Sequence, residues 1–190
     1  MPAASGELYR FIVFIPHANV RAEFNKYRRE LFASGFAAAY SFPAAAPVAL
    51  VQAPASMYEL RRMAALFRER SYENSAAGRI QTASISSAYL PNGKIIAGPR
   101  LSIETPPIPE SVSVIATFPE LILGVGVFPE RQRQSPLRLP LRLPPTLQPP
   151  ISFSAAALAN MTLRPLEYET SYSWTIGEPQ WLPARNSRRE

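Results

Sequence analysis

The pattern of apolar and polar residues predicts a strand, a helix and a second strand between Leu8 and Leu50. The first run, Leu8–Ile15, is nearly continuous in aromatic and β-branched residues and is closed by Pro16, which is typical of a strand buried on both faces. From Asn19 the apolar spacing changes to steps of three and four, which indicates an amphipathic helix of about five turns. Its apolar positions are Val20, Phe24, Tyr27, Leu31 and Phe32, and its other faces carry Arg21, Glu23, Lys26, Arg28 and Arg29.

Local signals set the ends of this first helix and the character of the segment after it. Asn19 is the expected N-cap and Gly35 the expected stop, so the helix is predicted over Asn19–Phe36. Tyr40 to Val51 is apolar again but contains Pro43 and Pro47. Because proline donates no ladder hydrogen bond, this segment is predicted to be an edge strand or a bulged strand rather than a regular central one.

A second helix is predicted over Ser56–Tyr72. Ser56 followed by Glu59 fits a capping box, in which the serine accepts from a first-turn amide and the glutamate reaches back to the serine N–H. Helical spacing follows in Met57, Leu60, Ala64 and Phe67, with Arg61, Arg62, Arg68 and Glu69 on the solvent side.

Strands then follow in succession. Asn92-Gly93 lies between two β-compatible runs, 80–90 and 94–103, and predicts an antiparallel hairpin. Apolar residues alternate from Val112 to Phe118, and the run 121–128 is interrupted by two glycines that predict a bulge or a close backbone approach. Strand patterns resume at 151–166, 170–176 and 180–182.

The chain divides by composition. Residues 1–128 are expected to hold an N-terminal lobe and the first strands of a second lobe, a division implied by the family resemblance given below, and residues 151–183 are expected to supply the closing strands. Between them, residues 129–150 hold seven prolines and a repeated Leu-Arg-Leu-Pro, which favours a mobile insertion, extended or disordered, and leaves open a docking peptide. Residues 184–190 are expected to be a loose tail. The elements together predict an α+β fold with two long helices on a largely antiparallel sheet.

The composition excludes most familiar catalytic machinery. The chain has no cysteine, no aspartate and one histidine, His17. A Ser-His-Asp triad, a thiolate zinc site and an EF-hand are therefore impossible, and we expect neither metal nor cofactor. No Gly-x-Gly-x-x-Gly or Walker-type loop occurs. With no predicted signal peptide or membrane span, the expectation is a cytoplasmic monomer without membrane contact.

The net charge of +6 is concentrated in two segments. Residues 129–150 and 183–190 hold seven arginines against two glutamates. Arginine-rich segments, here 129–150 and 185–189, bind polyanions weakly through counterion release, although solvated charge that keeps a loop soluble is the simpler interpretation.

The order of elements resembles the two-histidine phosphoesterase superfamily, which includes RNA 2′-5′ ligase-like and cyclic phosphodiesterase proteins. The similarity rests on the late strand Ala159-Asn160-Met161-Thr162-Leu163 and on the ending Tyr172–Gly177 with Trp181-Leu182-Pro183. It implies two pseudo-symmetric lobes, each contributing a His-x-Thr/Ser-hydrophobic strand to a central cleft where two histidines act as acid and base.

Both motifs are degenerate in this chain. The first position reads Pro47-Val48-Ala49-Leu50, and the second reads Asn160-Met161-Thr162-Leu163. Because asparagine cannot exchange a proton near neutral pH and proline has no side-chain donor, the acid and base of the family are both missing. The resemblance thus implies a binding cleft lined by Pro47, Ala49, Asn160 and Thr162, with Arg100 and Arg164 as anion contacts.

The expected function is a catalytically degenerate protein that binds a nucleotide, an RNA end or another phosphate-bearing ligand between the lobes. Two alternatives stay open. One is a phosphodiesterase that uses His17 or Glu167, although a histidine in such a turn is more often a cap or loop residue than a catalyst. The other is a protein-interaction module that uses the Pro/Arg-rich segment. The late strand also fits an ordinary strand in which Thr162 satisfies a backbone group.

Overall fold

The computed structural model describes most of the chain outside its termini and the Pro/Arg-rich segment. The described residues are 7–36, 38–39, 41–52, 56–73, 80–89, 95–104, 107–118, 120–128, 153–165, 170–177 and 180–181. The predictions for residues 129–150, for 184–190 and for Glu167 fall outside them and stay predictions.

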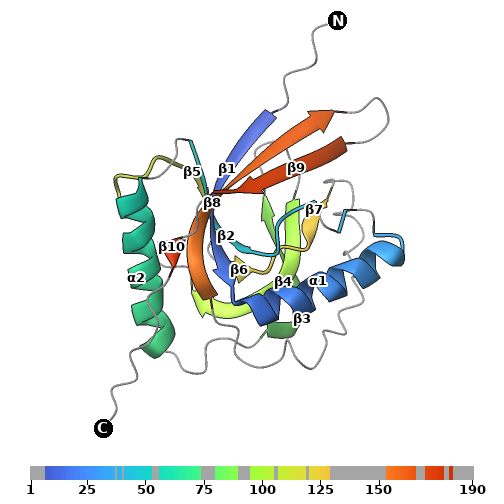
Figure 1. The fold of residues 1–190 in the computed structure, drawn as a ribbon, viewed down its shortest axis with the longest axis horizontal. Helices are drawn as coiled ribbons and strands as arrows, with labels where there is room; N and C mark the ends of the chain where they lie inside the picture. The colour runs from blue at the N-terminus through green and yellow to red at the C-terminus, as the bar shows by residue number, and fades with distance from the viewer. Residues whose placement is uncertain are drawn as a thin grey trace, which may run out of the picture.

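The described part is a mixed α+β structure of two helices and antiparallel strands (Figure 1). The helices are α1 (Ala18–Ala33) and α2 (Met57–Glu73). The strands are β1 (Glu7–Pro16), β2 (Ala46–Val51), β3 (Ile80–Tyr89), β4 (Ile95–Glu104), β5 (Val114–Thr117), β6 (Glu120–Ile122), β7 (Gly126–Phe128), β8 (Phe153–Pro165), β9 (Thr170–Ile176) and β10 (Gln180–Trp181).

The first strand is central, as its apolar run predicts. In the larger sheet the order of the described strands is β10-β8-β1-β2-β5, and β9 also pairs with β8. Residues Phe11–Ile15 are buried on both faces of the sheet. Every described pair in both sheets is antiparallel, so the predicted helices on an antiparallel sheet are confirmed.

The second strand is bulged, as predicted, but it is not an edge. It lies between β1 and β5, and its register against β1 shifts between Ile12 and Val13. Pro47 pairs with Val13 next to this shift. A bulge accommodates the missing proline N–H inside a sheet, which explains how this segment occupies an interior position.

The helix ends agree with the sequence in part. The first helix begins at Ala18, so Asn19 is not its N-cap; His17 holds that position and makes no side-chain cap bond. Gly35 ends the helix with φ +97°, a conformation that glycine adopts without steric cost. In the second helix the capping box is confirmed, because Ser56 N donates to Glu59 Oε2 at 2.7 Å and Glu59 N donates to Ser56 Oγ at 3.3 Å.

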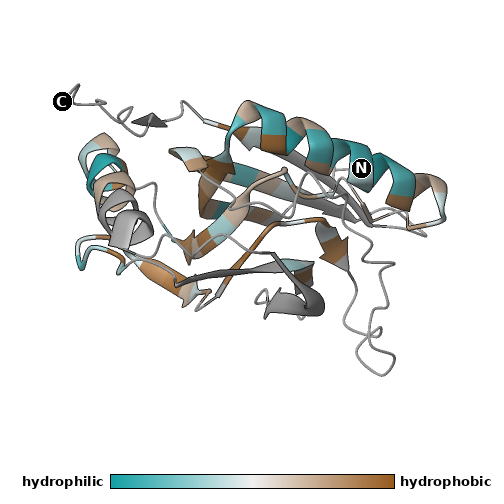
Figure 2. Ribbon diagram, turned by 90° about the horizontal axis from the view of Figure 1, so that it is seen from below, coloured by the Kyte–Doolittle hydropathy of each residue, from teal (hydrophilic) through white to brown (hydrophobic). Residues whose placement is uncertain are grey.

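The larger sheet separates two apolar clusters. One cluster joins Ile12, Phe14 and Ala156 of the sheet to Phe24, Leu31, Leu60 and Met63 of the two helices. The other joins Phe11, Val13 and Ala157 on the opposite face to Phe42, Phe118 and to Ile96 and Ile122 of the smaller sheet. Figure 2 shows the hydrophilic outer side of α1 facing away from the hydrophobic strands.

The smaller sheet has the order β3-β4-β6, with β7 also on β4. Its first two strands form the predicted hairpin, with Tyr89 opposite Ile95. The segment 118–126 links both sheets: Phe118 N and Gly124 N donate to Val48 O and Ala45 O, while Leu123 N donates to Pro99 O of β4.

The predicted close backbone approach lies in this link. A Cβ on Gly126 would lie 1.9 Å from Ala38 O, and one on Gly124 would lie 2.3 Å from the Phe42 ring. Both distances are shorter than van der Waals contact, so each position requires glycine.

Arg28 connects the first helix to this link. The sequence pattern placed it on a polar face of the helix, and that prediction is wrong. Arg28 is 1% exposed. Its Nε donates to Val125 O at 3.2 Å, its Nη1 to Asn25 Oδ1 at 3.0 Å and its Nη2 to Phe42 O. The burial is tolerated because these acceptors satisfy the guanidinium.

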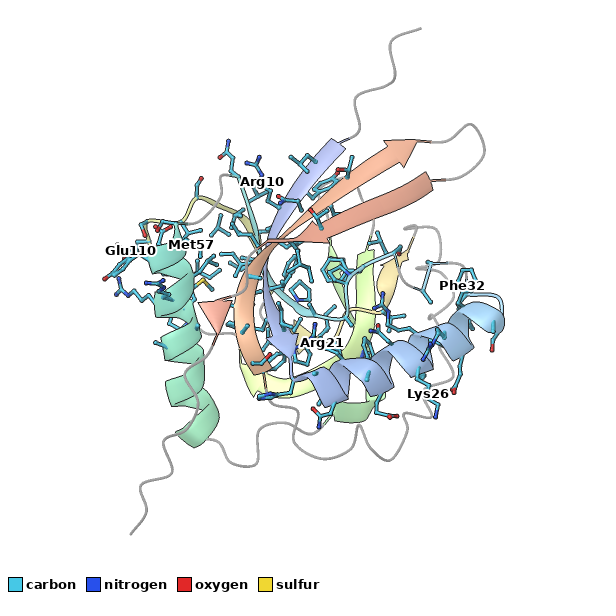
Figure 3. The ribbon with its side chains drawn as sticks, in the orientation of Figure 1. Arg10, Arg21, Lys26, Phe32, Met57 and Glu110 are labelled. Carbon is cyan, nitrogen blue, oxygen red and sulfur yellow. The ribbon has the colours of Figure 1, made fainter. Side chains whose placement is uncertain are left out.

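Two residues assigned to the apolar helix faces are instead exposed. Phe32 near the end of α1 is 55% exposed and Met57 at the start of α2 is 41% exposed. Both lie in the terminal turn of their helix, where the sheet no longer covers the apolar stripe (Figure 3).

Candidate functional site

The structure brings the two degenerate motif strands to either side of β1. Ala49 of β2 pairs with Ile12, and Asn160 of β8 pairs with Arg10. Because directly opposite residues of an antiparallel pair project to the same face, Ala49 and Asn160 share one face of the sheet. This is the face on which α1 and α2 pack.

The two motif positions differ in exposure. Pro47 is buried and Ala49 is 0% exposed beneath the helices. Asn160 and Thr162 are each half-buried. Only the second motif therefore presents side-chain atoms to a ligand.

Arg10 is a candidate site residue that the sequence analysis missed. It lies directly opposite Asn160 and is half-buried. Figure 3 shows it on the part of the sheet that extends past α1. The sequence did contain a signal: Arg10 is a charged residue inside an otherwise apolar strand. A strand that is buried on both faces rarely holds a charge, so the arginine indicated that this part of the strand is not fully buried.

These side chains form one polar surface, which we call the outer surface and define as Leu8, Arg10, Asn160, Thr162 and Thr175. Leu8 pairs with Thr162, and Asn160 pairs with both Arg10 and Thr175. Leu8 and Thr175 are exposed. Figure 1 shows the start of β1, the end of β8 and the start of β9 extending beyond both helices.

The chemistry of the outer surface suits an anion. Its five residues hold one guanidinium, one carboxamide and two hydroxyl groups, and no carboxylate. A guanidinium offers a planar fork of N–H donors that matches phosphate or carboxylate oxygens, and an amide and hydroxyls add further donors.

The two arginines predicted as anion contacts lie on different sheets. Arg164 pairs with Ser171, two positions beyond Thr162 along β8. Arg100 belongs to β4 of the smaller sheet, where it pairs with Gln81 and Ile122. Their side chains are outside the described part of the structure, so their predicted contacts stay predictions.

His17 lies at the opposite end of β1 from Arg10. It is exposed at the N-cap of α1, one residue past the end of the strand. With the usual rise per strand residue, the backbones of residues 10 and 17 are about 20 Å apart. A ligand seated at Asn160 is therefore beyond the reach of the imidazole.

The described residues contain neither a cluster of metal-ligating side chains nor a helix that could span a membrane. Within the described ranges, no group of three or more His, Cys, Asp or Glu side chains could hold a metal ion. Of the two helices that the structure describes, neither is long and apolar enough to cross a membrane.

Comparison with known proteins adds no assignment. No family model, curated protein or solved structure matches this chain. The outer surface is thus interpreted from its own chemistry.

Proposed function

We propose that this chain binds a phosphate-bearing ligand, a nucleotide or an RNA end, on the outer surface and does not hydrolyse it by a two-histidine mechanism. The observation that carries the proposal is the pairing of Arg10 with Asn160 beside Thr162 on a stretch of sheet that extends beyond the two described helices (Figure 1). A guanidinium with adjacent amide and hydroxyl donors matches the oxygens of a phosphate group.

The resemblance to two-histidine phosphoesterases, with its two pseudo-symmetric lobes, belongs to the same proposal. Its support is that β2 and β8, the two strands with motif-like sequences, flank β1. The proposed ligand position differs from a cleft between lobes, because Asn160 shares the helix-covered face of the sheet and the inter-sheet face is filled by apolar side chains such as Phe11 and Phe118.

The argument against hydrolysis rests on proton transfer. In-line attack on a phosphodiester by that route needs one group that takes a proton and another that gives one near neutral pH. Within the outer surface, neither the carboxamide of Asn160 nor the guanidinium of Arg10 exchanges protons in that range. His17 lies at the other end of the strand.

A binding titration tests the proposal. A nucleoside 2′,3′-cyclic phosphate and a short RNA are titrated into wild type, Arg10→Gln and the matched control Arg29→Gln, whose side chain is exposed on α1. Losing a charge-assisted contact weakens binding in Arg10→Gln by about tenfold to a hundredfold. Arg29→Gln is expected to bind like wild type. Equal weakening by both variants would show nonspecific attraction and refute the site.

A deletion variant and a hydrolysis assay complete the test. Removal of residues 129–150 and 184–190 leaves binding intact if the outer surface carries it, and abolishes binding if the arginine-rich segments do. Purified wild type is expected not to turn over cyclic phosphates or 2′-5′ linkages. Turnover that disappears in His17→Ala or in Glu167→Gln would identify an enzyme and contradict the binding-only function.

A further inference from the structure

The two ends of the larger sheet differ in their protection against pairing with another strand. At one end of the described sheet lies β5, which has four residues and a register shift against β2 between Leu50 and Val51. Short edge strands and bulges are devices that prevent edge-to-edge association. This end of the sheet is therefore protected.

The other end carries β9, which has none of these devices. Its seven residues run in unbroken register along β8, from Thr170 opposite Pro165 to Ile176 opposite Ala159. Its sequence, Thr-Ser-Tyr-Ser-Trp-Thr-Ile, contains no charged residue, proline or glycine. Among the described strands, only β8 pairs with it. An uncharged edge strand of this length is a template for another strand.

The two described helices pack elsewhere on the sheet and do not lie along β9. The second helix lies beside β8 and β10. Figure 1 shows β9 beside the part of β8 that extends past α1, with only the arrowhead of β9 reaching toward the side where α2 lies.

We infer that β9 is an interface at which two copies of this chain pair antiparallel, edge to edge, around a two-fold axis at Ser173. A seven-residue strand paired with its own copy is matched along its whole length when its central residue, Ser173, lies opposite itself. Since β9 is uncharged, no like charges meet across the axis. The interface is isologous and closed, and the two sheets become one continuous sheet. This inference does not depend on the proposed function.

The absence of cysteine from the chain provides a direct test. In Ser173→Cys the only two thiols of a dimer lie opposite each other on the axis, where Cα atoms of an antiparallel pair are about 4.5–5.5 Å apart, within disulfide range. The matched control is Ser113→Cys, an exposed serine that immediately precedes β5 at the protected end. Both variants are oxidised mildly over a series of dilutions, and wild-type mass is followed by light scattering.

The cross-linking and light-scattering results distinguish pairing through β9 from its absence. Pairing through β9 predicts a concentration-dependent wild-type dimer and rapid, nearly complete cross-linking of Ser173→Cys, with Ser113→Cys linking only at the rate of random collision. Thr175→Lys, which adds a charge to the edge, is expected to lower the dimer fraction more than Thr117→Lys on β5. Equal cross-linking rates for the two cysteine variants, or a wild-type monomer at every concentration, would overturn it.

Discussion

The inner and outer halves of β1 and β8 share one backbone ladder and differ in what covers them. In the inner half, Ile12 and Phe14 are fully buried opposite Leu158 and Ala156, beneath the helices. In the outer half, Leu8 is 51% exposed, and Arg10 and Asn160 are half-buried opposite each other beyond the two described helices. Backbone pairing orders both halves, and Tyr9 and Met161 of the outer half are buried on the opposite face of the sheet, whereas on the helix side burial stabilises only the inner half. The outer half is therefore free to carry polar groups for binding.

The largest expected effect is on the inner half. Phe14→Ala removes a fully buried ring that contacts Phe153, and we expect it to lower the free energy of unfolding by about 3–5 kcal/mol. Leu8→Ala, six positions earlier on the same strand, is expected to change it by less than about 0.5 kcal/mol. Urea unfolding of both variants measures the difference. Similar losses would mean that the outer half is as well packed as the inner half.

Three arginine variants separate structural from binding roles. Arg28→Gln leaves backbone acceptors at Phe42 and Val125 without their buried donors, and is expected to cost about 2–4 kcal/mol. Arg10→Gln is expected to cost less than about 1 kcal/mol while it weakens ligand binding. Arg29→Gln, beside Arg28 but exposed, is expected to do neither. A stability loss in Arg10→Gln equal to that in Arg28→Gln would remove the distinction between the two halves.

The smallest predicted effect is seen only at alkaline pH. Burial raises the pKa of the Tyr27 phenol from 10.0 to about 12. Between these pH values the unfolded chain loses a proton that the folded chain keeps, so the free energy of unfolding falls as pH rises. Tyr27→Phe is expected to flatten that decline, and the exposed control Tyr58→Phe is expected to keep it. Urea unfolding at stepped pH measures both slopes, and identical slopes in wild type and Tyr27→Phe would contradict the assignment.

Local sequence signals predicted the elements whose cause is local. The capping box of Ser56 and Glu59 and the antiparallel pairing of β3 with β4 need only residues that are close in the sequence. Gly124 and Gly126 correctly indicated a close backbone approach. The first two signals act within a few residues, whereas the glycines indicated that something packs closely without identifying the distant segment around Ala38 and Phe42.

Tertiary partners decided the features that the sequence did not predict. Arg28 is buried because carbonyls 14 and 97 residues away accept its hydrogen bonds, and no helical periodicity reveals such acceptors. The interior position of β2 likewise depends on β5, which pairs along its other side.

The candidate site was predictable to a similar extent. Asn160 and Thr162 were identified from their strand, and the structure places them together. Arg10 could be recognised as a candidate site residue only from the register of β1 against β8, because its partner Asn160 lies 150 positions away in the chain. Pro47 and Ala49 are buried and have no polar side-chain group, and the burial of Ala49 follows from the helix-side core that packs on it.

The central place of β1 has a consequence for folding during synthesis. Its partner β8 follows β1 by well over a hundred residues, so β1 leaves the ribosome long before that side of its ladder can form. Such high contact order slows folding, and the buried positions of β1, among them Phe11 and Phe14, stay accessible to other chains in the interval. Nascent chains that end before Phe153 are expected to bind chaperones through this strand, and release should coincide with the emergence of β8.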